Sequence, residues 1–225
     1  MPTAAILPVK RFSQAKQRLH PALGAGSRTA LAAAMFADVL AALRHASLID
    51  TILLVSGEPT VQDVAMESEV TLIADLSEKG QSPAALSGLA RASALGYDSA
   101  LLIPGDTPLI DPLEIDSLVS STALADVDVV IVPDRHGTGT NALVMNPGGT
   151  FQPQFGPDSL QRHVEQAKRR SMRHEVRPLE SLALDIDTGE DLAELRRAFE
   201  THHGRGPRTQ GVLKQIDRSQ RPIPA

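Results

Sequence analysis

The stretch Ala4-Ala5-Ile6-Leu7-Pro8-Val9 is a short apolar run near the start of the chain, and Lys10-Arg11-Phe12-Ser13-Gln14-Ala15-Lys16-Gln17-Arg18 follows it directly. A continuous apolar run predicts a strand buried on both faces of a sheet, because a half-exposed strand would alternate apolar and polar residues. The second stretch predicts a loop beyond the end of that strand. This loop carries four cations, Lys10, Arg11, Lys16 and Arg18.

Further apolar runs recur along the chain, separated by segments with helical spacing. Helices are expected from Ser27 as N-cap, from about Val61, and over residues 84–95, 112–123 and 157–170. Strands are expected over residues 51–55, 70–73, 100–103 and 127–132, near Val176, and at 182–184. Buried strands that alternate with helices predict a mostly parallel sheet covered by helices on both faces.

The order of elements changes after Thr138. Residues 141–145 predict a strand with no helix just before it, so one antiparallel strand is expected inside the parallel sheet. A last helix is expected after Asp187, with Thr188 and Asp191 as an acidic capping box, ending near Phe199. Residues 1–200 should then form one domain. Residues 201–225, rich in Gly, Pro, Arg and Gln, are interpreted as a mobile basic tail whose deletion from 203 onwards leaves activity intact.

Composition excludes several functions. The chain has 225 residues, 42% of them hydrophobic, which suits one α/β domain with a real core. The absence of Cys excludes disulfides and thiolate chemistry. A net charge of -5 and only 3% aromatic residues argue against a nucleic-acid partner. With no run of 18 apolar residues and no signal-peptide plan, no membrane association and a cytoplasmic location are expected.

Three carboxylates follow predicted strands, where open α/β sheets bind ligands. Asp106 lies in the turn Pro104-Gly105-Asp106, and Asp185 and Asp187 follow residues 182–184. Spacing of two on an extended segment points Asp185 and Asp187 to the same side. Converging carboxylates repel unless a cation intervenes, and Mg²⁺ prefers such hard oxygen ligands. The trio predicts a magnesium site, although each Asp alone is also typical of a turn or helix cap.

Anion-binding features lie in three loops. The basic loop with Lys10 and Lys16 is suited to a triphosphate, or is simply a solvated surface loop. No Walker-type or Gly-x-Gly-x-x-Gly motif is present. Residues 134–141 are polar and glycine-rich, and residues 155–159 lead into a helix whose free N–H groups would attract an anion. His163, one turn after Ser159, either faces the same site or lies on the helix surface.

A set of short motifs in a fixed order resembles a known family. The motifs are Leu7-Pro8-Val9-Lys10 with Lys16, Pro104-Gly105-Asp106, Asp134-Arg135 with Gly137-Thr138-Gly139-Thr140-Asn141, Phe155-Gly156-x-x-Ser159, and Asp185-Ile186-Asp187-Thr188. Together they span residues 4–198 and resemble the CofC/FbiD guanylyltransferases of coenzyme F-420 biosynthesis. The resemblance implies a single-domain nucleotidyltransferase fold of the glycosyltransferase-A type, Rossmann-like and similar to MobA.

The resemblance also implies the substrates and their contacts. GMP would pass from GTP to phosphoenolpyruvate, 2-phospho-L-lactate or 3-phospho-D-glycerate, with Mg²⁺ as cofactor and the next pathway enzyme as a further partner for the labile product. The implied metal ligands are Asp106, Asp185 and Asp187. The implied acid contacts are Thr140, Gly156 and Ser159. The implied catalytic residues are Lys10, Lys16 and Asp106, and the implied nucleotide contacts are Leu7, Pro8, Val9, Lys10, Lys16, Gly80, Ser82, Pro104 and Gly105.

One departure concerns the segment after the third strand, where many relatives have an Asn and this chain has Pro83. Gln81 or Ser82 would have to supply the lost polar contact. Two alternatives remain open. A transferase acting on molybdopterin or a sugar phosphate would commonly carry a glycine-rich loop in place of residues 10–13. A noncatalytic nucleotide-binding module would not need all three Asp residues.

Overall fold

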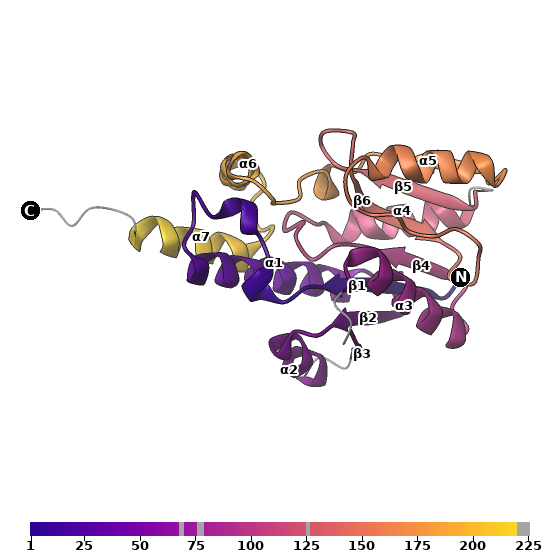
Figure 1. Ribbon diagram of the computed structural model, residues 1–225, viewed down its shortest axis with the longest axis horizontal. Coiled ribbons are helices and arrows are strands. Elements are labelled where there is room, and N and C mark those ends of the chain that lie inside the picture. Colours follow the sequence, from indigo (N-terminus) through magenta and orange to yellow (C-terminus); the bar gives the residue numbers. More distant parts are fainter. Residues whose placement is uncertain (68–69, 76–78, 125–126, 220–225) are drawn as a thin grey trace, which may run out of the picture.

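A computed structural model describes residues 1–67, 70–75, 79–124 and 127–219. These residues form one seven-stranded sheet in the order β3-β2-β1-β4-β6-β5-β7 (Figure 1). The strands are β1 Thr3–Val9, β2 Thr51–Ser56, β3 Thr71–Ala74, β4 Ser99–Leu102, β5 Val129–Pro133, β6 Thr140–Met145 and β7 His174–Val176. The helices are α1 Ala25–His45, α2 Pro59–Glu67, α3 Gln81–Ala94, α4 Pro112–Leu124, α5 Ser159–Arg169, α6 Gly189–Thr201 and α7 Pro207–Ser219. Short 3₁₀ helices are η1 Phe12–Gln14, η2 Gln17–Leu19 and η3 Glu180–Leu182.

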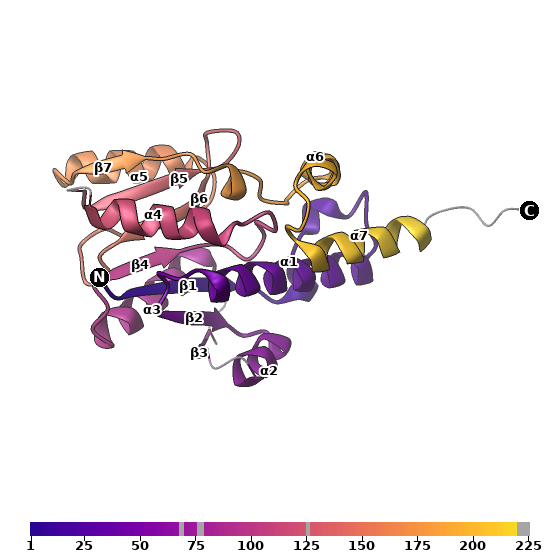
Figure 2. The same ribbon diagram turned by 180° about the vertical axis from the view of Figure 1, so that it is seen from behind.

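Strand β1 lies inside the sheet and is buried on both faces, as its apolar run predicts. Ala5 and Leu7 pack in one core cluster with residues of α1 and α4, whereas Ala4 and Ile6 pack in a second cluster with residues of α3 and α5. Successive side chains of a strand point to opposite faces, so one apolar run serves two helical layers. The two layers lie on opposite sides of the sheet in Figures 1 and 2.

The predicted antiparallel strand is confirmed. Strand β6 lies between β4 and β5 and runs antiparallel to both, with Val144 opposite Leu101 on one side and Val130 on the other. The remaining strand pairs are parallel. Because β6 is reversed, its first residue, Thr140, pairs with Pro133 at the edge where the parallel strands end. Residues that enter β6 therefore share an edge with residues that leave β1, β2 and β4.

Two local predictions were wrong. Helix α1 begins at Ala25 with Gly24 as N-cap, ahead of the expected cap at Ser27, and neither residue caps it through a side chain. Residues 182–184 were expected to form a strand, but Leu182 is the last residue of the 3₁₀ helix η3, and residues 182–184 belong to no strand of the described sheet. Leu182 packs in the first core cluster, with residues of α1 and α4, whereas Leu184 and Ile186 pack in a third core cluster. The capping box of Thr188 and Asp191 at the start of α6 is confirmed.

The expected mobile tail is also corrected. Residues 207–219 form helix α7, which packs beside α1 in Figures 1 and 2 and buries Leu213 and Ile216 in the third core cluster. Its first turn is fixed by the buried carboxylate of Asp38 on α1, which accepts hydrogen bonds from Thr209 N at 2.8 Å and Thr209 Oγ1 at 2.7 Å. Residues 220–225, including the basic Arg221, lie outside the described residues.

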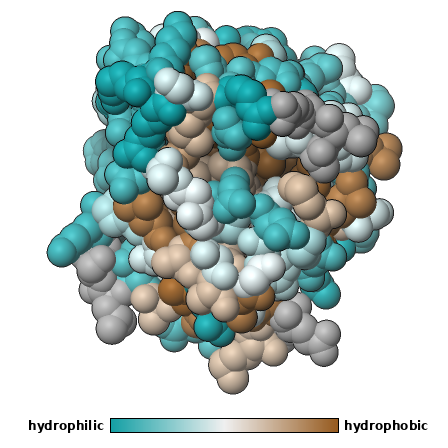
Figure 3. Space-filling model, turned by 90° about the vertical axis from the view of Figure 1, so that its right-hand side faces the viewer, coloured by the Kyte–Doolittle hydropathy of each residue, from teal (hydrophilic) through white to brown (hydrophobic). Residues whose placement is uncertain are grey.

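Helix α1 is, by length and composition, apolar enough to cross a membrane, and it is the single such helix among the described residues. However, 61% of its most apolar window is buried inside the protein, as expected for a core helix. The end of the molecule where the parallel strands begin faces the viewer in Figure 3, with hydrophilic and hydrophobic residues interspersed. The predicted site residues lie towards the opposite end, where the parallel strands finish.

Candidate active site

A cleft of about 390 Å³ opens at the carboxyl ends of β1, β2 and β4. Its walls come from the end of β1 with the basic loop, from α1, from the start of α3 and from the turn after β4. The predicted residues that line it are Pro8, Val9, Lys10, Lys16, Gly80, Pro104, Gly105, Asp106 and Asp187. Arg11 and Arg18 line it as well, so all four cations of the basic loop face one cavity. Such a cavity suits a polyanion held by local charge, although the chain as a whole is acidic.

Two predicted nucleotide residues lie elsewhere. The side chain of Leu7 is fully buried in the core, so only its backbone is available to a ligand. The hydroxyl of Ser82, in the first turn of α3, accepts a hydrogen bond from the backbone N–H of Phe155 at 2.9 Å. Gln81, in contrast, lines the cleft. Of the two residues considered as substitutes for the missing Asn, Gln81 is therefore the one that lines the cleft.

Pro83 does not disturb the helix that carries these residues. It is the third residue of α3, in the first turn, where backbone N–H groups have no intrahelical partner. Gly80, the N-cap, has φ +114°, a conformation that favours glycine, and it leaves the start of the helix open to the cleft. Pro83 is compatible with the helical backbone of this turn and offers no polar side chain to the cleft.

Asp106 lies in the turn after β4 and is tied to the segment that carries the other two carboxylates. The backbone N–H of Ile186 donates to the Asp106 carbonyl oxygen at 3.2 Å, so the segment 185–187 runs directly beside the turn. One carboxylate oxygen of Asp106, Oδ2, accepts a hydrogen bond from Lys16. The other, Oδ1, is buried and has no hydrogen-bond partner among the described residues. A buried carboxylate oxygen without a partner is an available ligand for a cation.

Lys16 joins Asp106 to Asp187. Its ammonium nitrogen lies 3.0 Å from Asp187 Oδ1 and also pairs with Asp106 Oδ2. Burial disfavours the charged lysine, but the two carboxylates outweigh it and raise its pKa to about 12. Lys16 is therefore charged throughout the physiological range. Its backbone is left-handed, with φ 57° and ψ 37°, an uncommon conformation for a residue other than glycine that often marks a functional position.

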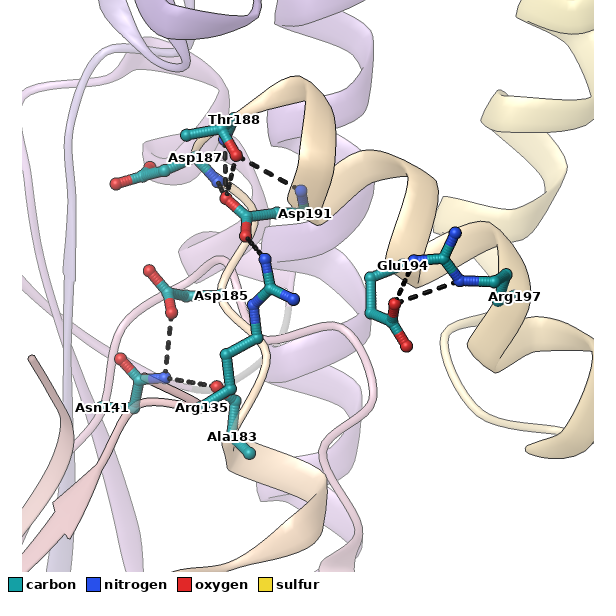
Figure 4. Close-up of polar contacts among 9 residues, drawn as sticks. All are labelled: Arg135, Asn141, Ala183, Asp185, Asp187, Thr188, Asp191, Glu194 and Arg197. Carbon is teal, nitrogen blue, oxygen red and sulfur yellow. Dashed lines mark hydrogen bonds and ion pairs between the residues drawn. The ribbon is translucent and has the colours of Figure 1, made fainter. Parts of the chain in front are cut away.

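Asp185 and Asp187 point to the same side of their segment, as their spacing predicts (Figure 4). Asn141, in β6, donates from Nδ2 to Asp185 Oδ1 at 3.1 Å and to the carbonyl oxygen of Leu182 at 2.7 Å. Arg135 forms an ion pair with Asp191, in the first turn of α6, with Nη2 2.5 Å from Asp191 Oδ1. Residues at the start of β6 and of α6 thus contact one side of the segment 185–187. The side of this segment that faces Asp106 and Lys16 stays open to those two residues.

The sequence predicts a metal site, but the structure does not show that site preformed. Within residues 1–67, 70–75, 79–124 and 127–219, no three His, Cys, Asp or Glu side chains converge closely enough to hold a metal ion. Asp106 and Asp187 share the ammonium group of Lys16, and Asp185 pairs with Asn141. The donor set still fits Mg²⁺, because it consists of carboxylate oxygens and includes the unpartnered Asp106 Oδ1.

The three carboxylates are electrostatically coupled. Burial, together with the neighbouring charge of Asp106, raises the pKa of Asp185 to about 6. Between about pH 4 and pH 6 the carboxyl group of Asp185 is therefore protonated in the folded protein, whereas in the unfolded chain it has lost its proton. Raising the pH through that window lowers the free energy of unfolding, and the loss is complete above about pH 6.

In metal-free buffer with a chelator, an Asp185→Asn variant is expected to unfold at a higher temperature than the parent protein at pH 8, and the gain should shrink at pH 5. Asn keeps the oxygen that accepts from Asn141 and removes the unfavourable charge. Thermal unfolding followed by circular dichroism at both pH values is the measurement. A variant that is destabilised at pH 8, or whose gain is equal at both pH values, would contradict the assigned charge state.

The residues predicted to contact the acid meet at the start of α5. Leu160 N donates to the Thr138 carbonyl oxygen at 3.1 Å, which joins the loop before β6 to the first turn of the helix. Gly156, with φ +115°, turns the chain into this helix, and Arg162 reaches back to the Gln154 carbonyl oxygen at 2.9 Å. Thr140 and Ser159 are 7% and 2% exposed, so direct contact with a ligand is restricted to a small opening.

Comparison with known proteins adds the deciding observation. Residues 3–223 match the family model described as guanylyl transferase CofC-like. The chain belongs to the CofC guanylyltransferase family. A phosphoenolpyruvate guanylyltransferase of Conexibacter woesei is 43% identical over 97% of this chain and 98% of its own length. A 2-phospho-L-lactate guanylyltransferase of Methanothermobacter thermautotrophicus is 33% identical over 96% and 92% of the two chains.

Solved structures agree with this family at the level of the fold. A nucleotide-diphospho-sugar transferase structure from Desulfovibrio desulfuricans G20 matches with a TM-score of 0.75 at 18% identity, covering 97% of this chain and 96% of that one. A nucleotidyl transferase from a Methanothermobacter species matches with a TM-score of 0.62 at 18% identity, covering 88% and 97%. The predicted single-domain glycosyltransferase-A type of nucleotidyltransferase fold is thereby confirmed, and this CofC family member is a nucleotidyltransferase.

Sequence reasoning missed three residues of this CofC family site. Asn141 was noted as part of a loop, but its hydrogen bond to Asp185 depends on a contact across 44 positions. Arg162 carried no motif. His163 was considered equally suited to a surface position, yet it is fully buried beside Thr140. Its position one turn after Ser159, on the same face of α5, was the available signal.

Proposed function

We propose that this protein transfers GMP from GTP to phosphoenolpyruvate and releases pyrophosphate, as a step in the biosynthesis of coenzyme F-420. The observation that carries the proposal is the cleft in which four basic side chains meet Asp106 and Asp187 at the carboxyl edge of the sheet. The choice of phosphoenolpyruvate rests on the name of the relative that is 43% identical over 97% of the chain. 2-Phospho-L-lactate and 3-phospho-D-glycerate are the competing acids.

The reaction needs alignment more than acid–base chemistry. A phosphate oxygen of the acid attacks the α-phosphorus of GTP, the bond between the α-phosphorus and the bridging oxygen breaks, and pyrophosphate leaves with that electron pair. The attacking phosphate is already ionised at neutral pH, so no strong general base is required. The protein must bring two anions together and neutralise them, which is what fixed cations and a closed geometry contribute to transfer reactions.

The residues of the chain divide this work. Lys10 and the permanently charged Lys16 would bind the triphosphate, with Arg11 and Arg18 at the rim of the same cleft. Backbone groups of Leu7, Pro8, Val9, Gly80, Pro104 and Gly105, together with the side chain of Gln81 in place of the predicted Ser82, would contact the nucleotide. Thr140, Gly156 and Ser159 would hold the acid. The bond from Phe155 N to Ser82 Oγ ties the acid-binding loop to the helix whose start lines the nucleotide cleft.

Asp106, Asp185 and Asp187 are the proposed ligands of Mg²⁺. When bound, Mg²⁺ would neutralise charge on the phosphate oxygens of GTP and assist departure of pyrophosphate. Lys16 already places a positive charge between Asp106 and Asp187. Lys16 and a bound Mg²⁺ would together stabilise the negative charge of the substrate phosphates at this edge of the sheet.

A cytoplasmic location is part of the proposal, since GTP and the phosphorylated acids are cytoplasmic metabolites. The product joins two phosphates through a reactive anhydride, so the next enzyme of the pathway is the proposed partner that receives it. No nucleic acid and no membrane take part. The proposed reaction needs neither a nucleic acid nor a membrane, and the acidic composition of the chain agrees with that.

The test is pyrophosphate release from GTP and Mg²⁺ in the presence of each of the three acids, with the next enzyme of the pathway added to consume the product. Release that depends on phosphoenolpyruvate, and that stops with a chelator, is expected. Release with another acid would correct the acceptor. Release from CTP in place of GTP would contradict the nucleotide, and no release under any condition would overturn the proposed function.

A further inference from the structure

His163 is a buried titratable side chain to which the proposed reaction assigns no role. It lies on α5 with no exposed surface, between the rings of Phe151 and Phe155, whose centroids are 5.7 and 5.6 Å from its own. Its Nδ1 is 2.9 Å from Thr140 Oγ1, and its Nε2 is 2.7 Å from the backbone nitrogen of Gln154. Both ring nitrogens are therefore engaged, each by a different part of the region proposed to bind the acid.

The two contacts define the tautomer of the ring. A backbone N–H can only donate, so Nε2 must present its lone pair to Gln154. Burial, with a smaller contribution from the charge of Arg162, lowers the pKa of His163 to about 4, so the ring is neutral at pH 7. A neutral imidazole has one hydrogen, which must then be on Nδ1 and must point to Thr140 Oγ1.

This tautomer dictates the direction of the Thr140 hydroxyl. Because Thr140 Oγ1 accepts from His163, its own hydrogen has to be donated elsewhere, and the described residues provide no acceptor for it. A hydroxyl in the region proposed to bind the acid, with its hydrogen left free, can donate to a phosphate or carboxylate oxygen of that acid. A ring with the opposite tautomer would take that hydrogen and leave only lone pairs facing the anion.

The second contact holds the loop that completes the same region. The backbone of Gln154 donates to His163 Nε2 and accepts from Arg162, while the next residue, Phe155, donates to Ser82. The chain just before Gly156 is thus fixed from α5 on one side and from α3 on the other. Arg162 and Ser82 still hold this loop without the ring, whereas His163 is the partner of the Thr140 hydroxyl among the described residues.

We propose that His163 is a positioning residue for the phosphorylated acid, which fixes the Thr140 hydroxyl as a hydrogen-bond donor to the acid through its own Nδ1–H. This proposal rests on the proposed function, since it takes Thr140 to contact the acid. It assigns His163 no contact with GTP and no proton transfer. Its effect should therefore be confined to the acid and should depend on the Thr140 hydroxyl.

The experiment compares His163→Phe, Thr140→Val and the double variant by pyrophosphate release at saturating GTP. Loss of an oriented hydrogen bond to a charged group should lower kcat/KM for the acid by about tenfold to a hundredfold. The KM for GTP should stay within about twofold, and His163→Phe should have little further effect when Thr140 is already Val. The positioning role would be overturned if His163→Phe lowered kcat/KM for the acid by the same factor with Val at position 140 as with Thr. It would also be overturned if His163→Phe raised the KM for GTP in parallel.

Two polar variants guard against a folding defect in His163→Phe. The side-chain amide of Asn can replace Nδ1–H towards Thr140, whereas the longer Gln can replace only the acceptor at Nε2. His163→Asn is therefore expected to recover most of the acid kcat/KM and His163→Gln is not; the reverse order would overturn the proposal. A parent enzyme inactive with every acid would overturn the proposed function itself, whereas an active parent with an unaffected His163→Phe variant would overturn the role of His163 alone.

Discussion

An Asp106→Asn enzyme is expected to lose turnover by about a hundredfold to a thousandfold, the range found when one preorganised electrostatic group is removed from an active site. Asp106 combines an unpartnered buried oxygen with an ion pair to Lys16, and its backbone holds the segment of Asp185 and Asp187. Asn keeps an oxygen for Lys16 and keeps the backbone, so the loss isolates the charge of the carboxylate. The measurement is pyrophosphate release at saturating GTP, acid and Mg²⁺.

A matched control is Asp128→Asn. Asp128 precedes β5 at the other end of the sheet and pairs with Arg173 at 3.2 Å, away from the cleft. An exposed ion pair contributes little to stability, so the turnover of the Asp128→Asn variant should stay within about twofold of the parent. Both variants should melt within a few degrees of the parent protein. Near-parental turnover of Asp106→Asn would remove Asp106 from the proposed reaction.

Truncation after Gly204, which removes α7, is expected to lower the free energy of unfolding by about 5 kcal/mol or more. Burial of Leu213 and Ile216, which are 3% and 6% exposed, stabilises the fold by about 1.5–3 kcal/mol each. Asp38, 4% exposed, would also lose its hydrogen bonds from the first turn of α7. Since a whole domain is stable by about 5–15 kcal/mol, the truncated protein should be largely unfolded or inactive at physiological temperature.

Two point variants sharpen this test by thermal or urea-induced unfolding. Leu213→Ala should cost about 2–5 kcal/mol, as other buried Leu truncations do, whereas Lys214→Ala, on the exposed side of the same helix, should stay within about 0.5 kcal/mol. A truncated protein with the parental melting temperature and full turnover would show instead that the tail is dispensable, as its composition first indicated. Activity is expected to fall with the loss of this packing, because Met35 of α1 packs in the same core cluster as Leu213 and Ile216 and also lines the cleft.

The misjudged tail shows where composition is a poor guide. Thr209, Leu213 and Ile216 have the spacing of one helix face, and Pro207 suits a first turn, but three apolar or small positions among Gly, Arg and Gln are a weak signal. What makes the helix stable is Asp38, 170 positions earlier in the chain, and no local pattern can show that pairing. The same limit applies to Lys16, whose partners Asp106 and Asp187 are 90 and 171 positions away.

Features that depend on local pattern were predictable. Apolar runs identified the central strands, the missing helix before residues 141–145 identified the reversed strand, and the position of Asp106 after a strand placed it at the ligand edge. The roles of Leu7 and Ser82 were not predictable, because membership in a motif does not tell which way a side chain points. Leu7 faces the core, and Ser82 is bonded to a loop 73 positions later.

The reversed strand β6 has a consequence for how acceptor preference can diverge among relatives. In the proposed function, segments that leave β1, β2 and β4 contact GTP, whereas the segment that enters β6 and the start of α5 contact the acid. These two sets of segments are separate stretches of chain, connected by the pairing of β6 with β4 and by the hydrogen bond from Phe155 N to Ser82 Oγ. Exchange of residues 134–140 and 154–163 between two relatives should therefore transplant the choice of acid while leaving nucleotide choice unchanged.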